Sequence, residues 1–111
     1  EGTESCFGSL SKPVEPTVSA PVVKSLFAAG GCLMGKTNMT EFGAKASSDS
    51  PLSGITSNPR NLNYTTGGTS AGAAASVAAG VTSFAIGTDG GGSTEYQLHS
   101  ADWLALNQLL G

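Results

Sequence analysis

Two glycine-rich segments that also carry hydroxyl side chains lie close together in this 111-residue chain. They cover residues 67–72 (GGTSAG) and 87–93 (GTDGGGS), and a run of small residues at 73–80 separates them. Nucleophilic acyl transfer needs such residues, because one hydroxyl attacks, a second relays its proton, and bare glycine backbone donates N–H groups to an oxyanion. The spacing therefore predicts two loops, about one helix apart, that serve the same chemistry.

Two helices are predicted from the spacing of apolar and small side chains. Residues 21–29 show a helical apolar stripe that begins at a proline and ends at a glycine pair. Residues 71–79 form the second predicted helix, with Thr69 or Ser70 as its cap and Gly80 at its end. Because the side chains of this second helix are very small, we expect it to pack closely against its neighbours.

The remaining elements are predicted from short apolar runs. Residues 32–34 and 82–86 are predicted to be buried strands, and residues 37–42 a short helix. Residues 44–66 are rich in Ser, Asn, Pro and Thr without a period, and are predicted to be one extended loop. This order of helices and strands favours an α/β fold with a partly parallel sheet.

Composition limits the possible partners and the size of the fold. The length allows one small domain at most, and only 12% of the residues are charged, which suits a buried α/β architecture. The net charge of −3 without a basic stripe argues against nucleic-acid binding, and no apolar stretch approaches a membrane span. The spacing of Cys6 and Cys32 suggests neither a disulfide framework nor a metal site. Free thiols and a cytoplasmic location are expected.

Residues 30–37 (GGCLMGKT) satisfy the G-x-x-x-x-G-K-T pattern of a phosphate-binding loop. Such a loop needs a strand before it and a helix that begins at the lysine, here Lys36. The predicted order is different, because a helix precedes Gly30 and the apolar run lies inside the loop. A nucleotide-binding module is therefore the less favoured alternative, and Lys36 is predicted to be structural, at the end of a strand.

The order of four motifs resembles that of the amidase-signature hydrolases, which cleave carboxamides with a Ser–cis-Ser–Lys triad. The blocks are AGGCLMGKTNMTEF at 29–42, GITSNP at 54–59, GGTSAG at 67–72 and GTDGGGS at 87–93. The resemblance implies a fragment of that α/β fold, a mixed β-sheet covered by helices. It also implies a small-molecule amide as substrate and neither a metal nor an organic cofactor. The sequence leaves the choice of amide and the oligomeric state open.

The second glycine-rich segment matches the part of the family motif that carries the nucleophile. By this resemblance Ser93 is the nucleophile. The backbone N–H groups of Gly90, Gly91 and Gly92, together with that of Ser93, form the oxyanion hole. Glycine suits this role because its bare backbone can approach a carbonyl oxygen closely.

The first glycine-rich segment matches the part of the motif that relays the proton. Thr69 stands where the family has its cis-serine, so it keeps the hydroxyl and adds a methyl group that stiffens the side chain. Ser70 is expected to be a supporting hydrogen-bond donor. Asp89 is expected to order the loop around the nucleophile rather than to take part in the chemistry.

The lysine of the triad has no match in this chain. In the family it lies just before a stretch that residues 2–9 resemble, so we expect it upstream of Glu1. None of the four lysines of the chain stands at the matching place: Lys12, Lys24, Lys36 and Lys45. Without a base of lowered pKa the serine hydroxyl is not activated, so this chain alone is predicted to be inactive. A non-catalytic remnant of an amidase gene is a further alternative.

The resemblance stops shortly after the nucleophile. The sequence therefore divides into a partial amidase-signature domain at residues 1–94 and a divergent tail at residues 95–111. The family continues with Arg-Ile-Pro-Ala-Ala-Phe, and synonymous codons for the observed tail give that continuation when the reading frame is shifted by one base. We therefore expect a reading-frame slip near codon 94.

Overall fold

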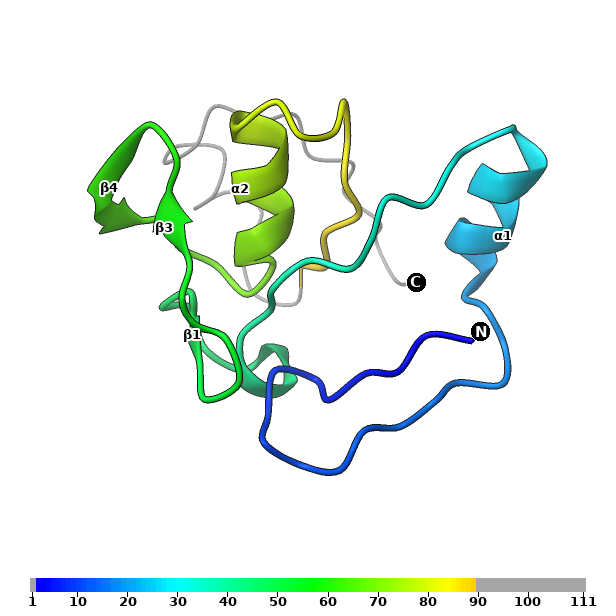
Figure 1. Cartoon of the computed structure of the whole chain (residues 1–111), viewed down its shortest axis with the longest axis horizontal. Coiled ribbons are helices and arrows are strands. Elements are labelled where there is room, and N and C mark those ends of the chain that lie inside the picture. The colour runs from blue at the N-terminus through cyan, green and yellow to red at the C-terminus, as the bar shows by residue number, and fades with distance from the viewer. Residues whose placement is uncertain (1, 90–111) are drawn as a thin grey trace.

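The computed structural model describes residues 2–89 of the chain (Figure 1). The expected nucleophile Ser93, the glycines Gly90 to Gly92 and the tail at 95–111 lie outside the described residues. The elements in chain order are α1 (Pro21–Ala28), a 3-10 turn η1 (Glu41–Gly43), β1 (Asp49–Ser50), β2 (Gly54–Ile55), β3 (Ser57–Asn58), β4 (Asn61–Thr65) and α2 (Ala71–Ala78).

Both predicted helices are present within one residue of their expected ends. Pro21 is the first residue of α1, where its missing N–H leaves no bond unmade, and Gly30 follows the helix with a φ of +86°. Gly80 follows α2 in the same left-handed region, with a φ of +71°. The short helix predicted at 37–42 is wrong in extent, because only the 3-10 turn η1 forms there.

The strands form two separate antiparallel pairs. In the first, Asp49 lies opposite Ile55, and in the second Ser57 lies opposite Thr65. One isolated parallel bridge joins Ser47 to Gly68. The fold is therefore an α/β fragment, as predicted, but the pairing in residues 2–89 is antiparallel apart from that bridge.

The prediction of an extended loop over residues 44–66 is wrong, because this stretch contains the four strands of the described residues. The strands are two to five residues long and mostly polar, so they show no apolar alternation. The Asn58 Oδ1 atom accepts a hydrogen bond from the Arg60 N–H at 2.9 Å, which closes a turn before β4. Hydrogen bonds rather than an apolar face hold this region.

The two strands predicted at 32–34 and 82–86 are also wrong. Both segments have irregular backbone in the structure. Leu33 and Met34 are exposed rather than buried. A strand needs a neighbour to accept and donate its ladder of hydrogen bonds, and residues 2–89 supply none at either place.

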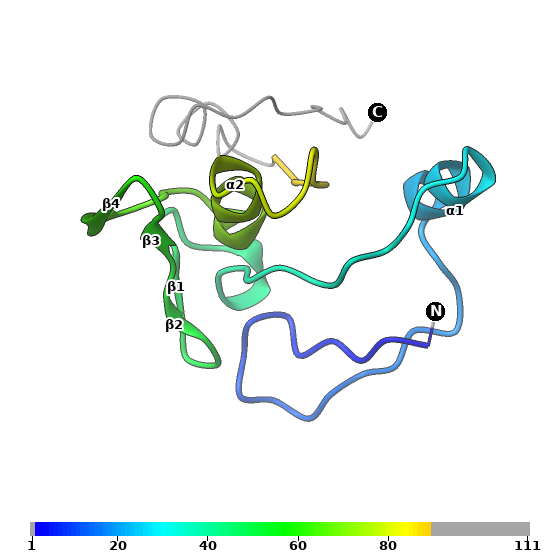
Figure 2. The ribbon, with the colours of Figure 1, turned by 45° about the horizontal axis from the view of Figure 1, so that its top comes forward.

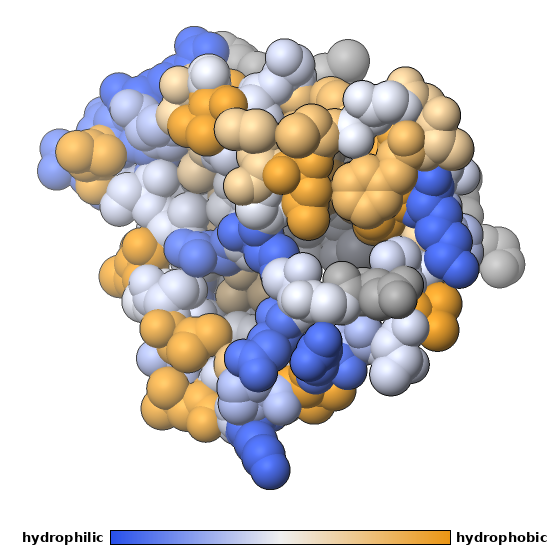
Figure 3. Space-filling view, turned by 45° about the vertical axis from the view of Figure 1, so that its right-hand side comes forward, coloured by the Kyte–Doolittle hydropathy of each residue, from blue (hydrophilic) through white to orange (hydrophobic). Residues whose placement is uncertain are grey.

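The interior consists of small and hydroxyl-bearing side chains. Within residues 2–89 the buried apolar residues are Ala71, Ala73 and Ala74, and Thr40 and Thr66 are also completely buried. Many large apolar side chains lie at the surface, some of them in the orange patches of Figure 3. In the part of the chain that the structure describes, no helix is long and apolar enough to cross a membrane.

Candidate functional site

The hydroxyl of Ser70 joins the two glycine-rich segments. Its Oγ accepts a hydrogen bond from the Thr88 N–H at 2.9 Å and donates one to the Thr88 carbonyl oxygen at 3.3 Å. Ser70, one of the two residues predicted to cap α2, stands at its N-cap position, but its side chain makes no cap bond to the helix. Its hydroxyl instead holds the backbone of the second segment at the start of α2.

Thr69 lies directly before this connection and is half-buried. Its carbonyl oxygen accepts a hydrogen bond from the Thr40 N–H at 3.2 Å. All peptide bonds of residues 2–89 are trans, so the cis geometry that the resemblance implies at Thr69 is not present. Asp89, which is also half-buried, follows Thr88 at the end of the described chain.

The first turn of α2 packs against the backbone of residues 38–40. The Gly72 N–H donates a hydrogen bond to the Asn38 carbonyl oxygen at 2.9 Å. A Cβ atom at Gly72 would lie 2.3 Å from the Asn38 nitrogen, so no side chain fits there. The Asn38 Nδ2 atom in turn donates to the Thr56 Oγ1 atom at 3.4 Å. Glycine at this position thus lets two backbones meet directly beside Thr69.

One buried hydroxyl in this region has no hydrogen-bond partner within residues 2–89. It is the Oγ1 atom of Thr40, whose residue is 0% exposed. The equally buried Thr66 donates from its Oγ1 atom to the Ser48 Oγ atom at 3.4 Å. The two fully buried threonine hydroxyls therefore differ in how well they are satisfied.

None of the ionisable residues of the described region is fully buried. The hydrogen bond from the Ser47 hydroxyl, followed by that from the Lys45 ammonium, lowers the pKa of Asp49 below its ordinary value. Residues 2–89 contain no group of three His, Cys, Asp or Glu side chains that could hold a metal ion. Cys6 and Cys32 are free thiols.

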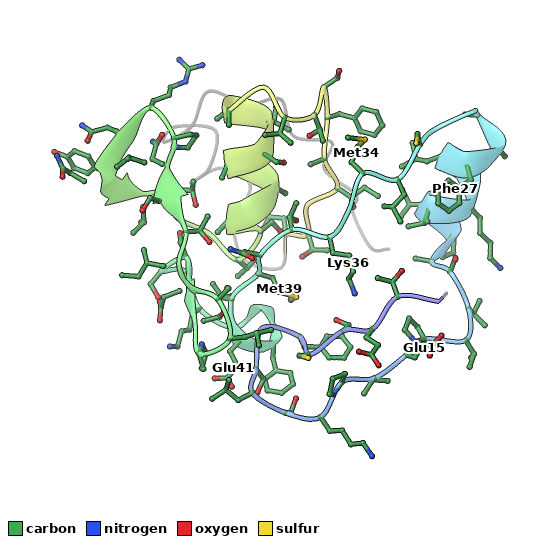
Figure 4. The ribbon with its side chains drawn as sticks, viewed as in Figure 1. Glu15, Phe27, Met34, Lys36, Met39 and Glu41 are labelled. Carbon is green, nitrogen blue, oxygen red and sulfur yellow. The ribbon has the colours of Figure 1, made fainter. Side chains whose placement is uncertain are left out.

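The geometry of a phosphate-binding loop does not form at residues 30–37. No helix begins at Lys36, and the next helical residues are those of the η1 turn. The Lys36 Nζ atom donates to the Glu4 carbonyl oxygen at 2.9 Å (Figure 4). Lys36 therefore has a structural contact that links two backbone segments. The prediction that it stands at the end of a strand is wrong. The arrangement gives no support to nucleotide binding.

Comparison with known proteins decides the family. The family model named Amidase matches residues 1–95. The chain belongs to the amidase family. The matched range includes all residues expected at the site: Thr69, Ser70, Asp89, Gly90, Gly91, Gly92 and Ser93.

Two kinds of relative match this amidase chain. It is 43% identical over 88 residues to a glutamyl-tRNA(Gln) amidotransferase subunit of Prochlorococcus marinus, covering 79% of this chain and 18% of that protein. The corresponding glutamyl-tRNA(Gln) amidotransferase subunit of Methanosarcina barkeri is 44% identical over 89 residues, with coverage of 80% and 19%. AmiB2 of Mycobacterium bovis, named as an amidase, is 45% identical over 92 residues, with coverage of 83% and 20%.

The match covers only part of each relative. The chain spans about a fifth of the length of the curated relatives it matches. No solved structure gives a significant match to it.

Proposed function

We propose that this chain supplies the nucleophile and the proton relay of an enzyme that cleaves carboxamide C–N bonds through an acyl-serine intermediate. Ser93 Oγ attacks the carbonyl carbon, and its proton passes through the Thr69 hydroxyl to a lysine. The backbone N–H groups of Gly90, Gly91 and Gly92 hold the oxyanion. The tetrahedral intermediate then expels ammonia or an amine, which takes up the proton, and water releases the acid from Ser93.

The pair of hydrogen bonds between Ser70 and Thr88 is the observation that carries this proposal. It fixes the backbone five residues before Ser93 against the residue that follows Thr69. Acyl transfer requires nucleophile and relay to be held in reacting geometry, because positioning provides much of the rate. In this proposal Ser70 supports the loop through these bonds and Asp89 orders it, and neither is assigned a chemical step.

The base of the triad has no candidate in this chain, and we assign it to a lysine outside the chain. The resemblance of residues 2–9 to the stretch after the family's lysine supports a position upstream of Glu1. Under this proposal the chain as given does not hydrolyse amides, and activity belongs to a longer polypeptide. The family match ends at residue 95, close to codon 94, where we propose a change of reading frame.

The relatives' names suggest two settings for the same chemistry. An amidase releases the amine to solvent, whereas one subunit of an amidotransferase works within an assembly of several chains. The proposal for this chain is the same in both settings: a small-molecule amide acylates Ser93, and water then releases the acid.

Labelling with a fluorophosphonate probe tests the proposal, because the probe reacts with activated serines. We expect no labelling of the chain as given and labelling of Ser93, located by peptide mass spectrometry, in the polypeptide extended upstream to include the lysine. Ser93→Ala should abolish labelling, whereas Ser83→Ala, which changes an exposed serine, should not. Absence of labelling in the extended polypeptide would favour the non-catalytic remnant and overturn the proposal.

A further inference from the structure

Residues 36–40 form a crossing segment that lies between the N-terminal segment (residues 2–9) and the first glycine-rich loop (residues 67–72). In Figures 1 and 2 the chain leaves α1 and crosses the molecule with residues 2–9 on one side and α2 on the other. The amidase chemistry proposed above uses nothing from residues 36–40. They nevertheless make specific contacts on both sides.

On the N-terminal side, one side chain and one backbone group hold the two segments together. The Lys36 Nζ atom donates to the Glu4 carbonyl oxygen at 2.9 Å, and Lys36 points toward the N-terminal segment in Figure 4. Just beyond the crossing segment, the Phe42 N–H donates to the Phe7 carbonyl oxygen at 2.7 Å. The rings of these two phenylalanines stack with centroids 6.4 Å apart.

Two glycines fix the distances between the backbones of the N-terminal segment, the crossing segment and the first turn of α2. A Cβ atom at Gly8 would lie 2.7 Å from the Met39 carbonyl oxygen, and one at Gly72 would lie 2.3 Å from the Asn38 nitrogen. Both are contacts with backbone, which cannot turn aside as a side chain can. The crossing segment therefore touches the N-terminal segment on one side and the loop of Thr69 on the other without intervening side chains.

We propose that residues 36–40 are a spacer that sets the position of the N-terminal segment relative to Thr69, and that Lys36 is a positioning residue for the reaction. This inference rests on the proposed function, in which the catalytic lysine lies upstream of the N-terminal segment. A spacer that holds that segment places the lysine within reach of the relay hydroxyl. Lys36 itself touches no reacting atom.

Kinetics of fluorophosphonate labelling in the extended polypeptide test the role of Lys36. Lys36→Met removes the donor but keeps the aliphatic stem, and we expect the maximal labelling rate to fall about tenfold with the concentration for half-maximal rate unchanged, because small misplacements are costly in rate. Lys36→Arg should restore most of the rate, since it keeps a donor. Lys24→Met, on the exposed face of α1, is the matched control and should label at the parent rate. Labelling of Lys36→Met at the parent rate would overturn the inference.

Substitutions at two glycines provide a second labelling test of the inference. Gly72→Ala should reduce labelling roughly a hundredfold, whereas Gly35→Ala, with nothing within 4 Å of its Cβ position, should leave it unchanged. If circular dichroism shows Gly72→Ala to be unfolded, the Lys36 variants decide the question.

Amide hydrogen exchange separates this inference from the proposed function. If the parent polypeptide is not labelled at Ser93, the proposed function fails, and exchange at the Phe42 and Thr40 amides then tests the spacer. Faster exchange at both amides in Lys36→Met, but not in Lys24→Met, supports a spacer that Lys36 holds in place. Unchanged exchange overturns it.

Discussion

Helices α1 and α2 have the same length of eight residues but opposite environments. Helix α1 carries valine, leucine and phenylalanine, yet none of its residues is buried. Helix α2 is mostly alanine, and its residues Ala71 to Ala74 are all buried. The larger apolar side chains thus lie on the helix that is less covered, and α1 stands apart from the other elements in Figure 1.

The difference shows that close approach, rather than side-chain hydrophobicity, determines what is buried in this fragment. The absence of a side chain at Gly72 lets the backbone of Asn38 meet α2 directly. Helix α1 has no comparable neighbour within residues 2–89. The following predictions use matched substitutions in the two helices and their surroundings to test this difference.

Enlarging a buried alanine of α2 should have the largest effect. Ala74 is 0% exposed, so Ala74→Leu is expected to destabilise the fold by about 3 kcal/mol through overpacking. Ala28→Leu makes the same change on the exposed end of α1 and should alter stability by less than about 0.5 kcal/mol. Urea unfolding followed by circular dichroism measures both, and equal effects would remove the distinction between the helices.

The two buried threonines near α2 should respond with opposite signs. Thr66→Val leaves the Ser48 hydroxyl without this donor and is expected to cost about 2 kcal/mol. Thr40→Val removes a buried hydroxyl that has no partner within residues 2–89, and is expected to stabilise by about 1 kcal/mol. Urea unfolding again provides the measurement. A loss of stability in Thr40→Val would contradict the view that its hydroxyl is unsatisfied.

Removing the hydroxyl at the start of α2 should have a smaller and local effect. Ser70→Ala deletes both bonds to Thr88 and is expected to weaken the connection by about 1 kcal/mol, which corresponds to roughly fivefold faster exchange of the Thr88 amide. Ser25→Ala on α1 is the matched control. Hydrogen exchange followed by nuclear magnetic resonance measures both, and an unchanged Thr88 amide would show that the serine does not hold the second segment.

The ion pair between Lys45 and Asp49 should contribute least to the stability of the fold, because both side chains are exposed to solvent. The folded-state pKa of Asp49 is lowered, so its contribution is present above the unfolded-state pKa and is lost as the pH falls through the lowered value. Ser47→Ala should raise this pKa more than Lys45→Met, since the serine hydrogen bond is the larger cause. A carboxyl titration by nuclear magnetic resonance measures the order, and a larger rise in Lys45→Met would contradict it.

Those features that depend on local sequence were predictable. Pro21, Gly30 and Gly80 mark the helix ends whatever surrounds them, so α1 and α2 were located correctly. The strands were not, because pairing depends on a partner elsewhere in the chain. The apolar run at 32–34 lacks such a partner in residues 2–89, whereas the polar strands β3 and β4 have each other. The Asn-Pro pair at 58–59 was the signal that could have revealed their turn.

The candidate site was predictable to a similar degree. Motif order indicated that the two glycine-rich segments belong together, and the bonds between Ser70 and Thr88 show the described parts of them in contact. The roles of Ser93 and Thr69 remain predictions. A structural role for Lys36 was predicted, but its partner could not be, because its contact with Glu4 joins residues 32 positions apart through a backbone oxygen that carries no sequence signal.

The contact between Ser70 and Thr88 also has a consequence for the order of folding. It joins residues 18 positions apart, and it can do so only after α2 has formed and the following residues have turned back. An eight-residue helix is marginal alone, so α2 must first gain its packing against residues 38–40. Residues 81–88 are therefore expected to be among the last parts of this region to assemble and among the first to open on heating, which the exchange of the Thr88 amide would report.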